Sequence, residues 1–188
     1  DTSVSRGLGD VYKRQKPMDI SLVSLSTTLA TNALVEDQGG RVALIFVGFR
    51  DGDLAKHSIN DALRGDPVLQ TKGGHNHAGD ETCRINLEEI KEWILQRDGV
   101  SAFAVASQFA TRNAAHELQI MELIRNLTDK PVTASHQLSS KLNGPRRALT
   151  AVLNARLIGI LDELIGRCGA TLSNLKIDAP LLVVRGDG

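Results

Sequence analysis

Short, almost continuous apolar runs alternate with amphipathic segments along this chain of 188 residues. The clearest runs are RVALIFV at 41–47 and SAFAVAS at 101–107, and such runs are typical of strands buried on both faces of a parallel sheet. Three shorter runs predict further strands, at 20–25, 131–135 and 180–184. Apolar positions at helical spacing predict helices at 29–38, 86–97, 113–127 and 144–169. This alternation predicts an α/β fold with a parallel sheet and flanking helices.

The segment 52–84 has no clear period and is predicted to be a long irregular loop. Within it, the stretch GGHNHAGDE at 73–81 brings two imidazoles and two carboxylates close together. Such a set suits a divalent metal ion, and long loops of this kind are often functional. The alternative is a solvated loop in which neither histidine is engaged. The candidate metal ligands or loop-site residues are His75, His77, Asp80 and Glu81.

The first predicted helix follows a strand directly and carries hydroxyl and amide side chains near its start. Thr27 and Thr28 can accept hydrogen bonds from the free N–H groups of the first turn. Thr28, Thr31 and Asn32 share one face, because residues three and four apart are neighbours on a helix. A polar face at this end of a helix is a common place to bind an anion or a substrate. The alternative is that these residues only cap and solvate the helix.

The longest predicted helix, 144–169, has one line of charged residues and an apolar surface beside it. Arg156, Glu163 and Arg167 fall on one line, and the spacing of Glu163 and Arg167 favours an exposed ion pair. We therefore expect this line to face water. Leu153 belongs to the neighbouring apolar positions and is expected to be buried.

A second polar line on this helix consists of Arg147, Thr150 and Asn154, on the side opposite the charged line. Because that side is expected to turn away from water, these groups need partners, and an unsatisfied buried polar group costs roughly 1–3 kcal/mol. They either bond a neighbouring element or line a substrate cleft. We expect them to share one substrate-binding region with the polar face of the first helix, closed by the 75–81 loop. The alternative is that each line is a local packing device.

The helix predicted at 113–127 begins with the motif NAAHE, whose polar residues we interpret as structural. Asn113 can cap the helix, and Glu117 suits the positive end of the helix dipole. His116 falls on an apolar stripe with Ile120, where a histidine is usually a satisfied core residue.

Composition limits the classes of partner and compartment. The formal net charge is zero and no basic cluster stands out, which argues against nucleic acid and anionic membranes as partners. No apolar run approaches the roughly 20 residues needed to cross a bilayer. Cys83 and Cys168 are far apart in no metal-like spacing, so a reduced, cytoplasmic location is expected.

Residues 1–15 have no apolar period, and their end, DVYKRQ, back-translates to GAT GTG TAT AAG AGA CAG. That nucleotide sequence resembles the transposon end used to prepare sequencing libraries. We expect this segment to be a disordered artefact and exclude it from the fold. A disordered native tail is the alternative.

Four segments resemble the hydantoinase A / 5-oxoprolinase family, which includes N-methylhydantoinases and acetone carboxylase beta-like proteins. They are STTLATNALVE at 26–36, GFRD at 48–51, NAAHE at 113–117 and RALTAVLNA at 147–155. The stretch GGHN at 73–76 also resembles a Gly-Gly-His-Asp element of one branch of the family, with Asn76 in place of the Asp. The chain departs from the family pattern at two further places, where Leu25 and Ser26 replace His-Gly and Ala114 replaces Pro. The resemblance implies the actin-like ATPase fold of sugar kinases, heat-shock 70 proteins and actin, truncated at both ends. It divides the chain into an N-terminal region at 16–138 and the start of a catalytic domain at 139–188.

The resemblance also implies a fragment of an ATP-dependent amidohydrolase that opens a cyclic amide of the hydantoin or 5-oxoproline type. The parent protein would use ATP and Mg²⁺, and the family's phosphate-binding segments are absent from this chain, so the isolated chain is expected to be inactive. Its implied partners are a small cyclic amide substrate and either the remainder of its own chain or a hydantoinase B-like subunit. Two alternatives stay open: a non-catalytic α/β subunit or interface scaffold, and an ATP-independent metal hydrolase that uses His75 and His77.

Overall fold

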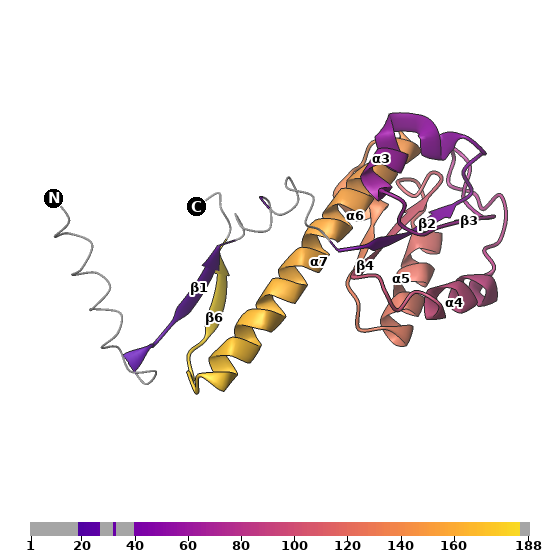
Figure 1. Ribbon diagram of the computed structural model, residues 1–188. Coiled ribbons are helices and arrows are strands. Elements are labelled where there is room, and N and C mark those ends of the chain that lie inside the picture. Colours follow the sequence, from indigo (N-terminus) through magenta and orange to yellow (C-terminus); the bar gives the residue numbers. More distant parts are fainter. Residues whose placement is uncertain (1–18, 27–31, 33–39, 185–188) are drawn as a thin grey trace. The chain divides into compact units, whose positions relative to one another are not determined.

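The structure is a computed structural model that describes residues 19–26, 32 and 40–184 (Figure 1). The segment interpreted as an artefact lies outside these residues, and so do Thr27, Thr28 and Thr31. The expectations for them therefore stay predictions. The chain divides into a larger unit, residues 33–160, and a smaller unit formed by residues 1–32 and 161–188.

A four-stranded parallel sheet forms the centre of the larger unit, with the strand order β3-β2-β4-β5. Its strands are β2 (Val42–Val47), β3 (Val68–Thr71), β4 (Ala102–Ser107) and β5 (Val132–Ala134). The helical elements are η2 (Asp53–Ser58), α3 (Ile59–Leu63), α4 (Leu87–Leu95), α5 (Ala115–Leu127), α6 (Ser135–Leu138) and α7 (Gly144–Asn174). The predicted α/β class with a parallel sheet and flanking helices is confirmed.

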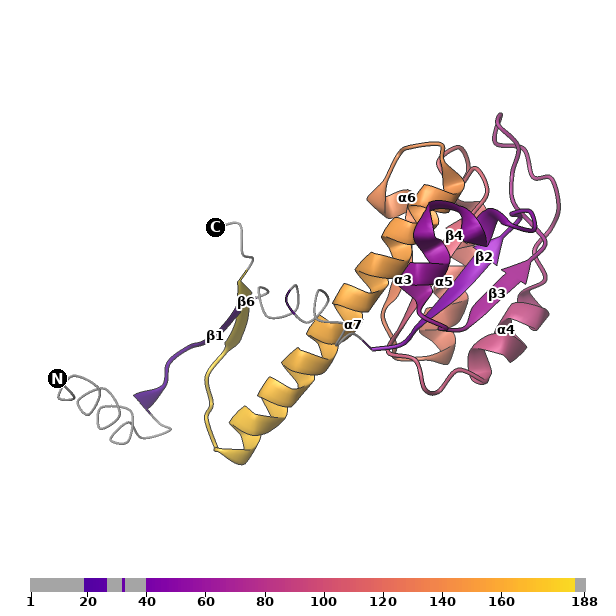
Figure 2. The same cartoon turned by 45° about the horizontal axis from the view of Figure 1, so that its top comes forward.

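The two central strands are buried at every position, as their apolar runs predict. Because successive side chains of a strand point to opposite faces, the sheet has two separate cores. One face packs against α3 and the first half of α7, and the other against α4 and α5 (Figures 1 and 2). Covering both faces with helices is what a parallel sheet requires.

The carboxyl ends of the central strands lie level with one another, because β2 and β4 pair from Val42 with Ala102 to Val47 with Ser107. After β2 the chain moves outward to β3, whereas after β4 it moves outward on the other side to β5. The point between the ends of β2 and β4 is therefore the topological switch point, where open α/β sheets commonly bind ligands.

The prediction of one irregular loop over 52–84 is wrong for its first part. That part forms η2, α3 and the edge strand β3, and only the stretch after Thr71 is irregular. The strand was missed because VLQT has four residues and no alternation, so its pairing with β2 decides its structure. The helix start at Asn86 is confirmed, because Asn86 Oδ1 accepts from Glu89 N at 3.2 Å. The capping role expected for Asn113 is wrong: the N-cap of α5 is Ala114, and Asn113, one residue earlier, accepts from Ala115 N at 3.0 Å.

The predicted orientation of the longest helix is also wrong in part. Arg156, expected in water, is buried and bonds Asp66, whereas Leu153, expected in the core, is 38% exposed. The buried face of α7 consists of small residues, chiefly Ala148, Ala151, Val152 and Ala155. Small side chains let the helix approach the sheet closely, and this arrangement leaves the larger leucines toward the sides. The ion pair of Glu163 with Arg167 forms on the surface as predicted.

The smaller unit contains one parallel strand pair, β1 (Val23–Ser26) with β6 (Leu181–Val184). β6 falls within the predicted run at 180–184, and β1 overlaps the predicted run at 20–25 but extends one residue further, to Ser26. Among the described residues, no helix combines the length and the apolar character needed to span a bilayer.

Candidate functional site

Loops that follow β2, β3 and β4 cross one another at the carboxyl edge of the larger sheet. Gly48 N donates to Thr71 O at 2.9 Å, and His75 N donates to Gln108 O at 3.2 Å. The loop after β3 thus passes over the end of β2 and reaches the end of β4. The crossing requires Gly48, whose φ is 75°, because a Cβ there would lie 2.4 Å from the carbonyl oxygen of Gly73.

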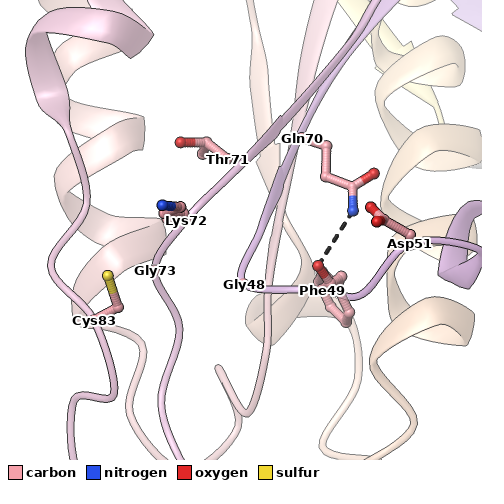
Figure 3. Close-up of a pocket in the computed structure, with 8 residues that line it drawn as sticks. All are labelled: Gly48, Phe49, Asp51, Gln70, Thr71, Lys72, Gly73 and Cys83. Atoms are coloured by element: carbon pink, nitrogen blue, oxygen red, sulfur yellow. Dashed lines mark hydrogen bonds between the residues drawn. The ribbon is translucent and has the colours of Figure 1, made fainter.

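One cavity at this edge, which we call the β2–β3 cavity, has a volume of 540 Å³. It is lined by Gly48, Phe49, Asp51, Gln70, Thr71, Lys72, Gly73 and Cys83 (Figure 3). Figure 3 shows Lys72 and Cys83 on one side of it and Asp51 on the other. Neither the Lys72 ammonium nor the Asp51 carboxylate bonds another described residue. The cavity therefore offers a charged donor and a charged acceptor to a small polar ligand.

A second cavity of 270 Å³ lies at the switch point between the ends of β2 and β4. It adjoins the β2–β3 cavity because Phe49, stacked on Phe46 at 3.8 Å, lines both. Two lining residues, His57 and Phe109, have φ angles of 55° and 54°. Such angles are uncommon outside glycine, and strain of this kind is concentrated at functional sites.

The charged side chains of this second cavity and its histidine already have partners. Asn143 Nδ2 donates to His57 Nε2 at 3.1 Å, so this ring nitrogen acts as an acceptor. Lys56 Nζ donates to Asp53 Oδ1 at 2.6 Å, and this hydrogen bond lowers the pKa of the Asp53 carboxyl. The cavity is therefore less available for polar recognition than the β2–β3 cavity.

A third cavity of 260 Å³, which we call the α6–α7 cavity, lies at the connection between those helices. It is lined by Leu138, Ser139, Lys141, Asn143, Arg146, Arg147 and Thr150. Asn143 also lines the switch-point cavity, so the three cavities follow one another along the same edge of the unit.

The histidine loop is held by a buried pair of imidazoles. His116 Nδ1 accepts from Gly74 N at 3.0 Å, and its Nε2 donates to Glu81 Oε1 at 2.8 Å. The ring of His75, only 2% exposed, lies 4.4 Å from that of His116. Burial, followed by the nearby His116, lowers the pKa of His75, while the hydrogen bond from His116 lowers the pKa of Glu81. The interpretation of His116 as a satisfied core residue agrees with this geometry.

The metal hypothesis gains no support from this arrangement. His77 is exposed, unlike His75, and the exposed Asp80 accepts from Asn76 Nδ2 at 3.0 Å. No group of three or more His, Cys, Asp or Glu side chains in the part of the chain that the structure describes could hold a metal ion. Local hydrogen bonds instead shape the loop around His116.

Glu117 is more deeply involved in structure than its position near the helix start suggests. Its carboxylate is completely buried and accepts from Ser107 N at 2.7 Å and Ser135 Oγ at 2.6 Å. It also accepts from the backbone N of His136 at 3.0 Å and its Nδ1 at 2.6 Å. One side chain thereby joins β4, α5 and α6.

The predicted polar line on α7 divides into different environments. Arg147 is 1% exposed, as expected, and donates to Lys141 O at 2.8 Å and Ser107 O at 3.0 Å. Thr150 is exposed, contrary to expectation, and its hydroxyl donates to Arg146 O at 3.0 Å. Asn154 is half-buried, and its Nδ2 lies 3.4 Å from Thr133 Oγ1. The helix turns Arg147 toward the sheet but leaves Thr150 at the edge.

The shared substrate region proposed for both helices stays a prediction. Of its first set, only Asn32 is described, and it is helical and exposed in the smaller unit.

Several residues at this edge were not selected from sequence, namely Phe49, Lys72, Gln108 and Phe109. Each lies one or two positions after the last residue of a strand. Position relative to the carboxyl end of a buried strand was therefore the available signal, and for Lys72 it was hidden because β3 was not predicted.

The sequence profile described as the hydantoinase/oxoprolinase N-terminal region matches residues 1–128. The chain is 25% identical over 198 residues to the acetophenone carboxylase gamma subunit of Aromatoleum aromaticum, covering 90% of this chain and 27% of that protein. It is 25% identical over 177 residues to 5-oxoprolinase 1 of Arabidopsis thaliana, covering 77% of this chain and 14% of that protein. With the caprolactamase subunit alpha of Pseudomonas jessenii it shares 26% identity over 188 residues, covering 90% and 27%.

Two solved structures share the fold. The ATP-dependent caprolactamase from Pseudomonas jessenii superimposes with a TM-score of 0.67 and 23% identity over 98% of this chain and 30% of that one. Nucleotide-free acetone carboxylase gives a TM-score of 0.56 and 11% identity over 82% of this chain and 26% of that one. The α/β architecture with parallel sheets is consistent with a lobe of the actin-like ATPase type. The chain spans about a quarter or less of the length of the curated relatives above.

Proposed function

Because the chain belongs to the hydantoinase/oxoprolinase family through its N-terminal region, we propose that it is part of an ATP-dependent enzyme that opens a cyclic amide of the hydantoin or 5-oxoproline type. The family match over residues 1–128 carries this proposal. Two relatives, named 5-oxoprolinase and caprolactamase, act by name on cyclic amides. The isolated chain is inactive in this proposal, since it spans only part of the proteins it resembles.

The β2–β3 cavity is the proposed binding site for the amide ring. A cyclic amide presents one N–H donor and one carbonyl acceptor, and the two unpaired groups of the cavity complement them. The Asp51 carboxylate accepts from the ring N–H, and the Lys72 ammonium donates to the ring carbonyl oxygen. The volume of 540 Å³ lies within the usual range for small-molecule sites. Holding the ring in one orientation is the contribution to catalysis that these residues can make.

ATP and a divalent metal are assigned to other parts of the parent protein. The chain has no G-x-x-x-x-G-K-[ST] phosphate loop. Its described residues contain no group of three metal ligands. No residue of this chain is therefore assigned to hold the metal–nucleotide complex, and no reaction step is assigned to it within this chain.

The proposed macromolecular partners are the remainder of the parent chain and a second subunit of the hydantoinase B type. Two relatives are named as subunits, the gamma subunit of acetophenone carboxylase and subunit alpha of caprolactamase. A second candidate activity is ATP-dependent carboxylation of a ketone, which the acetophenone carboxylase relative favours, since it matches 90% of this chain. A non-catalytic scaffold is the remaining alternative from a different class.

The test is to express the complete parent reading frame together with the neighbouring subunit gene and to measure ADP release. The substrates to supply are hydantoin, 5-oxoproline, caprolactam, and acetophenone with bicarbonate. Release with a cyclic amide alone supports the main proposal, and release only with ketone and bicarbonate supports carboxylation. No substrate-dependent release from a folded complex that binds ATP would favour the scaffold. The isolated 188-residue chain is the inactive control.

A further inference from the structure

The α6–α7 cavity is lined by three cationic side chains, Lys141, Arg146 and Arg147, and by no acidic one. Its volume of 260 Å³ has room for a small oxyanion. We propose that this cavity is a binding site for an oxyanion, either a carboxylate or a phosphate.

Two of the three cations have no counter-ion in the described part of the chain. The Lys141 ammonium and the Arg146 guanidinium form neither an ion pair nor a hydrogen bond with another described residue. Both residues are exposed, so an ion from solution can reach them. Two unpaired positive charges on one small cavity attract an anion and repel cations.

Arg147 contributes a guanidinium in a fixed position to the same cavity. Its Nε, Nη1 and Nη2 atoms bond Ser135 Oγ, Lys141 O and Ser107 O, which uses three of the N–H donors. A guanidinium has five such donors, so two N–H groups are not used by these contacts, and Arg147 itself lines the cavity. The three protein contacts also hold the guanidinium in one orientation, which lowers the entropy lost on binding.

Arg147 adds no net positive charge to the cavity, because the nearby Glu117 carboxylate offsets the charge of its guanidinium. The Glu117 carboxylate raises the pKa of Arg147 against the lowering by burial, which is the larger effect. Ser135 connects the two, donating to Glu117 Oε1 at 2.6 Å and accepting from Arg147 Nε at 3.4 Å. The surplus charge of the cavity is therefore that of Lys141 and Arg146, which matches a singly or doubly charged oxyanion.

The position of the cavity in the fold also favours a negatively charged ligand. The cavity lies at the N-terminal end of α7, a helix of 31 residues, where the helix dipole is positive. Thr150 donates its hydroxyl proton to Arg146 O, so Ser139 is the hydroxyl left to donate to the anion.

A carboxylate on the substrate or a phosphate group of the reaction would each satisfy this chemistry. This assignment to a reaction rests on the proposed function, whereas oxyanion binding itself does not. Binding to the 188-residue chain can therefore fail or succeed independently of the ADP-release assay.

The test is titration of the 188-residue chain with sodium phosphate or sodium acetate at constant ionic strength, with chloride as reference, followed by backbone amide NMR. We expect saturable shifts for residues 139–150 with at least one oxyanion and none with chloride. Saturation by phosphate alone points to a phosphate group, and saturation by acetate points to a carboxylate.

The double variant Lys141→Gln/Arg146→Gln should bind the oxyanion at least about tenfold more weakly, as expected when charge-assisted hydrogen bonds are lost. Both side chains are exposed, so the fold is retained. Arg125→Gln, at an exposed position on α5 outside the cavity, is the matched control and should leave binding unchanged. Equal weakening in both proteins, or shifts spread over all surface cations, would overturn the proposal.

Discussion

The Nη2 atom of Arg156 lies 2.6 Å from Oδ2 of Asp66, and the two side chains are only 3% and 6% exposed. The same Asp66 oxygen accepts from Val42 N at 2.9 Å, and Arg156 also donates to Ala62 O at 2.9 Å. This buried pair ties α7 to the start of β2 and to the loop that precedes β3. It therefore helps to fix the sheet whose carboxyl edge carries the three cavities.

Asp66→Ala should destabilise the chain by about 3–5 kcal/mol, because it leaves the Arg156 charge buried without a counter-ion. Urea unfolding measures the change. Glu163→Ala, which removes the exposed pair with Arg167, is the control and should cost less than about 1 kcal/mol. Equal costs for the two variants would show that the buried pair contributes little.

Ala151→Leu should destabilise the chain by about 1–3 kcal/mol, because a larger side chain must enter the tightly packed interface of α7 with the sheet. Leu153→Ala should change the free energy of unfolding by less than about 1 kcal/mol, since Leu153 lies at the edge of that interface. Thermal or urea unfolding compares the two. The reverse order would mean that the small-residue face is not the packed one.

Glu117→Gln should lower the free energy of unfolding by roughly 1–3 kcal/mol or more, because one buried donor is left unsatisfied. The amide places an N–H group opposite donors from Ser107, Ser135 and His136. Glu122→Gln, at an exposed position on the same helix, should be nearly neutral in urea unfolding. A neutral result at Glu117 would show that the surrounding donors can find other acceptors.

Stability should fall as the pH drops below about 6.5, because the folded state holds the pKa of His75 below its ordinary value of 6.5. In this range the unfolded chain binds more protons than the folded one, so lower pH favours unfolding, by at most about 1.4 kcal/mol per pH unit for one group. Urea unfolding between pH 5 and 8 measures the slope.

His75→Phe should flatten that slope, since it removes the titrating ring and keeps an aromatic side chain. The contribution of Glu81 to the pH dependence of stability falls in a separate, lower pH range. Its pKa is lowered from 4.5 in the folded state, so its stabilisation is present above about pH 4.5 and is lost as the pH falls further. An unchanged slope above pH 5 in His75→Phe would contradict the assignment to His75.

Lys72→Met in the complete parent enzyme should raise KM for the cyclic amide by about tenfold, the loss expected for one charged hydrogen bond. Asp51→Asn should also raise KM, because an amide oxygen is a weaker acceptor than a carboxylate. Lys91→Met, on α4 and away from the cavity, is the control. Steady-state kinetics with unchanged KM in both cavity variants would rule out the β2–β3 cavity as the ring site.

The sequence alone determined the elements whose signals are local. The runs at 41–47 and 101–107 identified the two central strands, because a strand buried on both faces must be apolar at nearly every position. The cap at Asn86 depends on Glu89, three positions away, so it too could be predicted. The family resemblance depended on short motifs and was confirmed by the match over residues 1–128.

Only the tertiary structure decided which polar groups meet. Asp66 and Arg156 lie 90 residues apart in sequence, and Gly74 and His116 lie 42 apart. Helical spacing placed Arg156 on a line with two surface charges, and alternation grouped His75 with His77. A periodic pattern states which residues share a face, but the partner that packs on that face decides whether a charge is buried, paired or left free at a cavity.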